Sequence, residues 1–190
     1  MATTRRDEKK KQAREAILQA ATAEFNEHGF ILTSVSKIMR RANLAVGTFY
    51  NYFPTKDDVL LELLKPLVNG VRFMIETGIA GRKNAIDLLE ESCDFVANYL
   101  DDHRFVLPLF LGERKGAPGF HKPFEELLKM GQIRKEIRED IPPELIVEMF
   151  HSIYQAASFS KLPISFKKNI QFKIKILIDG IRVNPERESQ

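Results

Sequence analysis

The sequence predicts an all-α protein, and three observations lead to that prediction. Apolar residues recur every three or four positions in one segment after another, which is the periodicity of helices with one buried face. No segment alternates apolar and polar residues for long enough to form a sheet. Apolar and charged residues make up 44% and 29% of the 190 residues, which is ordinary for a globular protein and leaves the periodicity to decide the class.

The first helix is expected over residues 10–27, with Gly29 ending it. Its apolar positions at helical spacing are Ala13, Ile17, Leu18, Ala20, Ala21 and Phe25. Residues 1–11 precede it as a polar arm that we expect to be frayed. Five residues of this arm carry positive charge within reach of a nearby phosphate: Arg5, Arg6, Lys9, Lys10 and Lys11.

Residues 33–56 predict two short helices joined by a tight turn. Thr33 is the expected cap of the first helix, whose inward positions are Val35, Ile38 and Met39. Asn43 tolerates the left-handed backbone that such a turn requires, and Pro54 ends a second helix expected over 45–52. That second helix mixes small and polar side chains with hydroxyl-bearing aromatic ones. The pattern is typical of a helix-turn-helix whose second helix lies in the major groove of DNA.

The rest of the chain predicts further amphipathic helices. Thr55 and Asp58 have the spacing of a capping box, which opens a helix that contains Pro66. Because proline cannot donate to the carbonyl of Glu62, we expect a kink there. Other helices are expected over 84–100, near 120–131, from Pro143 and from about Ser165. We expect one domain over 1–55 and a second over 56–190.

Positive charge gathers at the N-terminal end of the chain. Residues 1–56 hold ten Lys and Arg against five Asp and Glu, whereas residues 57–190 hold nineteen against twenty-one. The balances of +5 and −2 suggest a polyanionic partner for the N-terminal part alone.

Cysteine content and hydropathy exclude several classes of protein. The single cysteine, Cys93, excludes an internal disulfide framework and a cysteine-rich zinc site. Neither a signal peptide nor an apolar run long enough to span a bilayer is present. We therefore expect a cytoplasmic protein without a membrane partner, and we expect neither a cofactor nor a metal ion.

Three stretches of the chain carry a resemblance to a known family. Residues 25–29, residues 33–38 and the run GTFYNYFPTKDDVL at 47–60 resemble the N-terminal domain of the TetR-type (tetracycline-repressor-like) bacterial transcription regulators. The match spans about 50 residues at fixed spacing, and the rest of the chain resembles the family only in length and helical character. The resemblance implies a three-helix DNA-binding head, a connecting helix, and a helical body that binds a small-molecule effector and forms a homodimer.

The resemblance also implies roles for individual residues. Thr48, Tyr50, Tyr52 and Lys56 match phosphate-contacting positions, while Gly47 and Asn51 match positions near base edges. The last two long helices would form the dimer interface, the effector would release a palindromic operator, and the protein would act as a repressor. The full set of expected DNA contacts is Arg6, Thr33, Ser34, Val46, Gly47, Thr48, Tyr50, Asn51, Tyr52 and Lys56.

Two residues depart from the family pattern. Ala45 stands where Ser or Thr is common and cannot cap the second helix, and Val46 stands where Lys is frequent and cannot neutralise a phosphate. Binding would then depend on the basic arm, on Arg40 or Arg41, and on a contact of the Val46 methyl groups with a thymine methyl.

Alternative functions have less support in the sequence. Glu148 and His151 have the spacing of a di-iron motif, but that motif must occur twice, and no catalytic constellation is recognisable. We therefore expect no enzyme. A helical ligand-binding or interaction module without specific DNA binding is the second possibility.

The aromatic residues fit two interpretations equally well: a filled hydrophobic core, or the lining of an effector cavity. The chain has 14 Phe and no Trp, and bundles fill their cores with the same side chains that line apolar cavities. The candidates for a cavity lining are Phe73, Phe95, Tyr99, Phe110, Phe124 and Tyr154.

Overall fold

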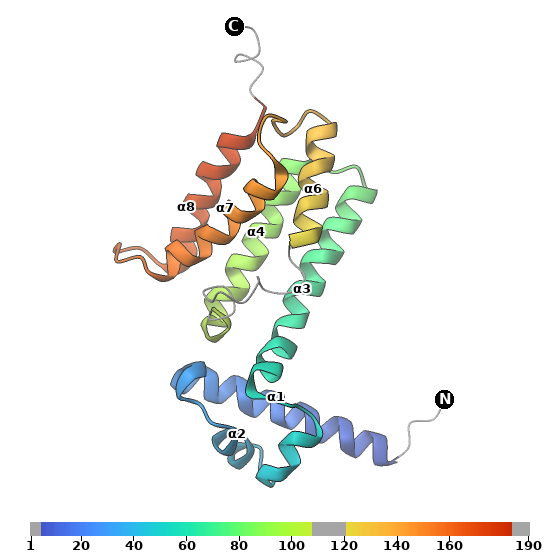
Figure 1. Cartoon of the computed structure of the whole chain (residues 1–190), viewed down its shortest axis with the longest axis vertical. Coiled ribbons are helices and arrows are strands. Elements are labelled where there is room, and N and C mark those ends of the chain that lie inside the picture. Colours follow the sequence, from blue (N-terminus) through green and yellow to red (C-terminus); the bar gives the residue numbers. More distant parts are fainter. Residues whose placement is uncertain (1–4, 108–120, 184–190) are drawn as a thin grey trace, which may run out of the picture. The chain divides into compact units, whose positions relative to one another are not determined.

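The computed structural model describes residues 5–107 and 121–183 of the chain (Figure 1). Within these ranges all regular elements are helices, and Ile137 and Arg182 form an isolated β-bridge. The all-α prediction is confirmed for the described residues. Phe110, one of the residues expected to line an effector cavity, lies outside them.

The chain divides into two compact units, which we call the head and the body. The head contains the described residues up to Pro66 together with Arg104–Val106, and the body contains the other described residues. The division therefore lies inside helix α3 (Lys56–Ala80), eleven residues after the predicted position between 55 and 56. Helix α3 continues through Pro66 and ends at Ala80.

The head is built on helix α1 (Arg5–Leu32). Helix α2 (Val35–Arg41) and the short helix η2 (Arg104–Val106) pack against α1, and η1 (Val46–Asn51) packs against α2. Helix α1 begins five residues earlier than predicted, so the basic arm is helical from Arg5 onward. Its helical geometry breaks at Gly29, where φ is 76°, as the sequence predicted.

Local signals at the other head boundaries are mostly confirmed. Asn43 has a φ of 55°, as the tight turn requires. The amide of Thr55 donates to Asp58 Oδ2 at 2.8 Å and the amide of Asp58 donates to Thr55 Oγ1 at 3.2 Å, which is a closed capping box. The predicted cap of α2 is wrong, because Ser34 and not Thr33 caps it.

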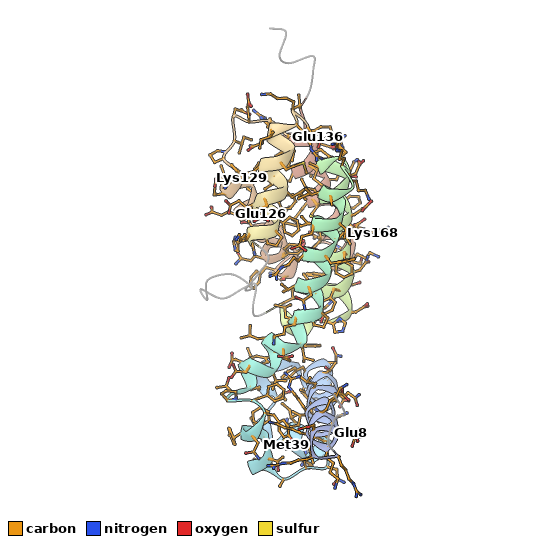
Figure 2. All side chains as sticks on the ribbon, turned by 90° about the vertical axis from the view of Figure 1, so that its right-hand side faces the viewer. Glu8, Met39, Glu126, Lys129, Glu136 and Lys168 are labelled. Atoms are coloured by element: carbon orange, nitrogen blue, oxygen red, sulfur yellow. The ribbon has the colours of Figure 1, made fainter. Side chains whose placement is uncertain are left out.

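The head core consists of buried apolar side chains from each of its segments. Met39 of α2 lies among them (Figure 2). The others include Ile17, Ala21, Phe25, Ile38, Phe49, Val59, Leu60 and Leu64. Because α2 and η1 are only seven and six residues long, this shared burial and not their own hydrogen bonds holds them in place.

The body consists of α3 from Leu67 onward and four more helices, α4 (Ala85–Asp102), α6 (His121–Ile133), α7 (Pro143–Ser158) and α8 (Phe166–Ile181). Helices α4 and α7 each pack against both α6 and α8, so the four helices enclose one apolar core (Figure 1). Glu136, after α6, accepts a hydrogen bond from the amide of Ala85 at 2.6 Å and so ties the start of α4 to α6 (Figure 2).

Gly131 allows α6 to approach α4 closely. A Cβ atom at this position would lie 2.6 Å from Ile137 Cδ1 and 2.7 Å from Ala85 Cβ, and the latter cannot move without the α4 backbone. We expect Gly131→Ala to lower the free energy of unfolding by about 1–3 kcal/mol through overpacking, as measured by urea titration. Adding Ala85→Gly should restore part of the loss. The control is Gly47→Ala in the head, where a Cβ meets nothing within 4 Å; equal stability of the Gly131→Ala variant and the wild type would contradict the close approach.

Candidate nucleic-acid interface

Helix η1 is a 3-10 helix over Val46–Asn51, where the sequence predicted a longer ordinary helix over 45–52. Phe49 is fully buried, and the ring of buried Phe53 lies 5.8 Å from it, so these two side chains anchor the helix to the head core. Ala45 occupies the N-cap and makes no side-chain hydrogen bond, as predicted. Side chains three apart share an edge of a 3-10 helix, so the anchoring by Phe49 leaves the other two edges facing away from the core.

Five residues form the exposed side of this element, which we call the readout face: Ala45, Val46, Gly47, Tyr50 and Asn51. The side chains of Val46 and Tyr50 are 47% and 62% exposed, and space beyond the Cα of Gly47 is open. The Tyr50 ring stands edge-on to Phe49, with centroids 5.4 Å apart, which gives it a fixed base. The structure thus brings together four predicted DNA contacts, Val46, Gly47, Tyr50 and Asn51, while Thr48 and Tyr52 beside them are half-buried.

Thr33 and Ser34 have different roles although they are neighbours. Thr33 is buried, and its hydroxyl donates to the carbonyl of Gly29 at 2.8 Å and approaches that of Glu24 at 3.1 Å. This hydroxyl holds the turn after α1 and does not face solvent. Ser34 is exposed, its Oγ accepts from the amide of Lys37 at 3.3 Å, and it lies 2.8 Å from Ser36 Oγ. Arg6 is exposed on the first turns of α1.

Lys56 holds the turn between α1 and α2. Its Nζ donates to the carbonyl oxygens of Phe30 at 2.6 Å and Thr33 at 2.7 Å, and it lies 4.3 Å from the centroid of the Phe30 ring. Burial lowers the pKa of Lys56. An ammonium group has three donors, so these two bonds leave one for the predicted phosphate contact.

Arg41 joins α2 to α1 through two carboxylates. Its Nε donates to Glu24 Oε1 at 2.7 Å and its guanidinium donates to Glu27 Oε2 at 2.5 Å. The hydrogen bond from Arg41 holds the pKa of Glu24 below its ordinary value, and His28 Nε2 lies 3.7 Å from the other oxygen of that carboxylate. The sequence made Arg41 a candidate DNA contact, and in the structure it also pairs with Glu24, a residue that is only 5% exposed.

A signal for this pair was present in the sequence. Glu24 lies four residues after Ala20 and seven after Ile17, so it falls on the apolar stripe of α1. A carboxylate in such a position requires a partner, because burying an unpaired charge costs free energy. Periodicity cannot say that the partner is Arg41, seventeen residues away on another helix.

The lowered pKa of Glu24 predicts a pH-dependent contribution to stability. A carboxyl group whose pKa is depressed by folding stabilises the protein above its unfolded pKa, and loses that contribution as the pH falls through the folded pKa. We expect the wild type to be more stable than Glu24→Gln at pH 7, and this difference to shrink as the pH falls below about 4.5, the ordinary value. Urea titrations at a series of pH values measure this difference in the free energy of unfolding. Glu15→Gln, at an exposed position, is the control; a difference that stays constant with pH would contradict the assignment.

The described residues expected to line an effector cavity differ in burial and come from α3, α4, α6 and α7. Phe73 is 69% exposed on α3, the half-buried Phe95 fills the hollow at Gly70, and Tyr99 stacks on His103 with centroids 4.2 Å apart. Phe124 and Tyr154 are buried; Phe124 lies 6.0 Å from Phe150 by ring centroids, and burial raises the pKa of both Tyr154 and the adjacent Cys93.

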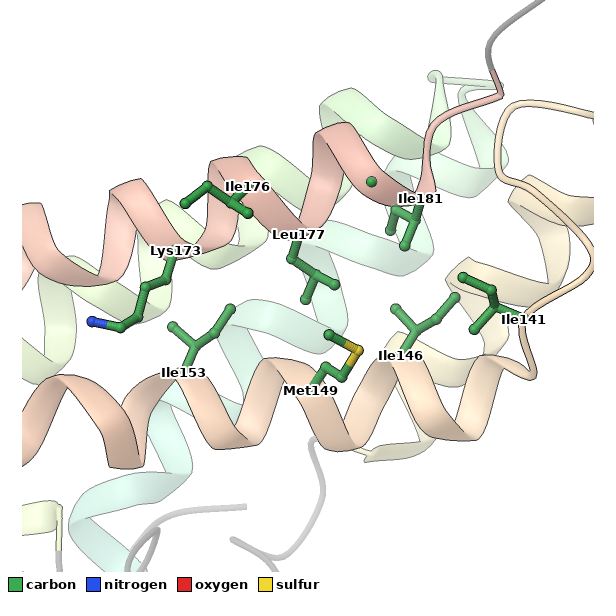
Figure 3. Close-up of a pocket in the computed structure, with 9 residues that line it drawn as sticks. Ile141, Ile146, Met149, Ile153, Lys173, Ile176, Leu177 and Ile181 are labelled. Atoms are coloured by element: carbon green, nitrogen blue, oxygen red, sulfur yellow. The ribbon is translucent and has the colours of Figure 1, made fainter. Parts of the chain in front are cut away.

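A shallow groove lies elsewhere in the body, between α7 and α8, and its volume is about 280 Å³ (Figure 3). Its walls are apolar, with Ile146, Met149 and Ile153 on α7 facing Ile176, Leu177 and Ile181 on α8. Lys173 stands at one end. Of the residues expected to line an effector cavity, none that the structure describes borders this groove.

Two negative findings apply to residues 5–107 and 121–183. Their His, Cys, Asp and Glu side chains form no cluster of three or more that could hold a metal ion. None of their helices combines the length and the apolarity that crossing a membrane requires.

Comparison with known proteins places the head in a family. Residues 17–63 match the model of the bacterial regulatory proteins of the tetR family. The HTH-type transcriptional regulator HbdR of Aromatoleum sp. (strain CIB) is 33% identical over 78 residues, which are 41% of this chain and 34% of that relative. The chain thus spans about a third of the length of this curated relative.

Solved structures of low sequence identity share the fold of nearly the whole chain. FadR of Thermus thermophilus, a TetR-family transcriptional repressor in complex with lauroyl-CoA, has a TM-score of 0.67 at 23% identity, covering 90% of this chain and 97% of that one. SmeT, the repressor of the Stenotrophomonas maltophilia multidrug efflux pump SmeDEF, has a TM-score of 0.73 at 20% identity, covering 90% and 91%. Residues 17–63 thus match the DNA-binding domain of the tetR family of bacterial regulatory proteins, and nearly the whole chain shares the fold of these two solved structures.

Proposed function

We propose that this protein is a sequence-specific DNA-binding transcriptional regulator that represses its target genes. The observation that carries the proposal is the readout face, an exposed and uncharged surface anchored by Phe49 within the segment that matches the tetR family. A helix-turn-helix presents such a surface to base edges in the major groove. The readout face has no charged group and so does not attract phosphates. The basic residues at the start of α1 supply that electrostatic attraction.

The proposed regulator is a homodimer that pairs through α7 and α8. Large apolar side chains lie exposed on the outer side of these helices and their connection: Leu145, Met149, Phe159, Leu162, Phe172 and Ile176. A monomer rarely exposes so many large apolar side chains on two adjacent helices, and the groove between the two helices offers a site for side chains of a second copy. Two heads joined by a two-fold axis would bind a palindromic operator.

The proposed effector is a small molecule with a large apolar part, which binds the body and releases the operator. The apolar part follows from the aromatic and aliphatic side chains of the body, because any cavity between its helices would be lined by them. Because the fold relative FadR is described with lauroyl-CoA, acyl-CoA thioesters are the first class to test. We further propose that the protein works in the cytoplasm and is not an enzyme.

Titration of the full chain against genomic duplexes tests the proposal. A dimeric regulator should bind one palindromic site much more tightly than other sequences, and addition of lauroyl-CoA should weaken that binding. Equal affinity for all duplexes, or none, would favour the alternative of a helical ligand-binding or interaction module without specific DNA binding.

The basic arm gives a separate prediction about phosphate neutralisation. Replacing Arg5, Arg6, Lys9 and Lys10 together with Ala should lower operator affinity and reduce the slope of log affinity against log salt by about 0.9 for each phosphate that is no longer neutralised. Replacing Lys161, Lys167 and Lys168 of the body with Ala is the matched control, since these exposed and half-buried lysines lie outside the head. Fluorescence titration at several salt concentrations measures both; an unchanged slope in the arm variant would exclude the arm from phosphate binding.

A further inference from the structure

The chemistry of the readout face determines which base pairs it can recognise. This question rests on the proposed function, because it concerns the operator that the regulator would bind. Gly47 and Tyr50 share one exposed edge of η1, and exposed Asn51 lies on the other edge, which continues to Ala45 at the N-cap. Val46, at the start of the helix, is nearly half exposed although it precedes the buried Phe49 by three residues. These residues are therefore the ones available to base edges.

The readout face carries methyl groups, one amide and one phenol, and no charged group. Guanine is read best by Arg or Lys on its O6 and N7 atoms, and cytosine by a carboxylate on its N4 amino group. Adenine is read by the amide of Asn or Gln, and thymine by apolar contact with its C5 methyl group. Asn51 and the methyl groups of Ala45 and Val46 are thus matched to the two bases of an A·T pair.

Three of the four cations in residues 33–56 are engaged elsewhere. Arg41 is paired with Glu24 and Glu27, and two donors of Lys56 are bonded to backbone carbonyls. The Nζ of Lys37 donates to the carbonyl of Leu32 at 3.3 Å. Arg40 is exposed, but it lies on α2 and not on the readout face. A guanine contact in the groove would therefore require one of these groups to leave its present partners or to reach across from α2.

We infer that the readout face selects A·T base pairs, with Asn51 bonded to adenine N6 and N7 and the Val46 methyl groups packed against a thymine methyl. The bare backbone at Gly47 allows η1 to approach the floor of the groove, because no side chain separates it from the bases. Tyr50, fixed against Phe49, lies on the edge adjoining Asn51 and contacts the sugar-phosphate backbone beside the A·T pairs. Specificity of this site thus comes from methyl contact and amide bonding, while cations outside the face supply affinity.

Selection from a random duplex library with the full chain tests the inference. The enriched half-sites should hold A·T pairs at the positions under η1. In the selected duplex, replacing each thymine there with dU removes only its methyl group, and this should weaken binding about fourfold at the thymine that Val46 contacts. The same dU substitution should have no further effect on Val46→Ala. Asn51→Ala should weaken binding by about 10-fold or more and relax the preference for adenine at one position.

Two controls separate readout from general binding. dU at thymines outside the half-sites should leave affinity unchanged, and Arg40→Ala should weaken binding to all sequences alike. Enriched half-sites with G·C pairs under η1, or a dU effect that persists in Val46→Ala, would overturn the inference and leave the proposed function standing. Failure to enrich any sequence would overturn the proposed function itself.

Discussion

Replacing Phe49 with Ala is expected to lower the free energy of unfolding of the head by about 3–5 kcal/mol. The Phe49 side chain is fully buried, and it contacts the rings of both Tyr50 and Phe53. Removing it leaves a cavity under a six-residue 3-10 helix that has no side-chain cap and cannot hold its shape alone. The readout face would then lose its fixed geometry, and operator binding should be abolished as a result.

Differential scanning calorimetry and operator titration measure the two effects of Phe49→Ala together. The control is Tyr50→Ala, which removes a large ring of the same helix at a largely exposed position and should leave the unfolding temperature almost unchanged. A variant with Ala at position 49 that kept both its unfolding temperature and its operator affinity would show that Phe49 does not anchor η1.

Replacing Ile176 with Glu is expected to convert the proposed dimer into folded monomers. The side chain is 74% exposed in the single chain and borders the groove between α7 and α8, so the substitution costs the monomer little. In a two-fold interface the residue occurs twice, and losing two buried isoleucines at about 1.5 kcal/mol each raises the dissociation constant on the order of 100-fold. The two carboxylates would add to that loss, because charges in an apolar interface are desolvated without partners.

Sedimentation of the Ile176→Glu variant over a range of concentrations measures the dissociation constant directly. Lys175→Gln is the matched control, since Lys175 is adjacent in the sequence but borders a different groove, beside Glu90 and Asp94. Affinity for a palindromic duplex should fall in the Ile176→Glu variant, while affinity for a single half-site should not change. An intact dimer of this variant would place the dimer interface away from the groove.

The features predicted correctly are those that neighbouring residues encode. Gly29, Asn43 and the Thr55–Asp58 pair act through the conformation or hydrogen bonds of adjacent residues, so each could be assigned without knowledge of the fold. The same holds for α8, which was expected from about Ser165 and begins at Phe166, with Ser165 as its cap. The absence of a side-chain cap at Ala45 also follows from a single residue, and the structure confirms it.

What local signals missed involves a distant partner, and the Thr33 cap is the prediction that failed for this reason. Thr33 has the side chain of a helix cap, but the carbonyls of Glu24 and Gly29 bind its hydroxyl, and Ser34 takes the cap. Arg41 follows the polar side of a short helix and stays partly exposed, but it also pairs with the buried carboxylate of Glu24, a partner that periodicity could not reveal. Burial makes such distant bonds strong enough to override local preference.

By itself, the sequence determined that this protein is helical, where most of its helices begin, and which segment presents a readout face. These properties follow from periodicity and from turn and cap residues, whose effects extend over one or two turns of chain. Only the tertiary structure decided that η1 is a 3-10 helix anchored by Phe49, that Lys56 and Arg41 hold the head together, and that Arg104–Val106 belongs to it. Each of these depends on contacts between residues distant in the chain, which the packing of the core alone brings together.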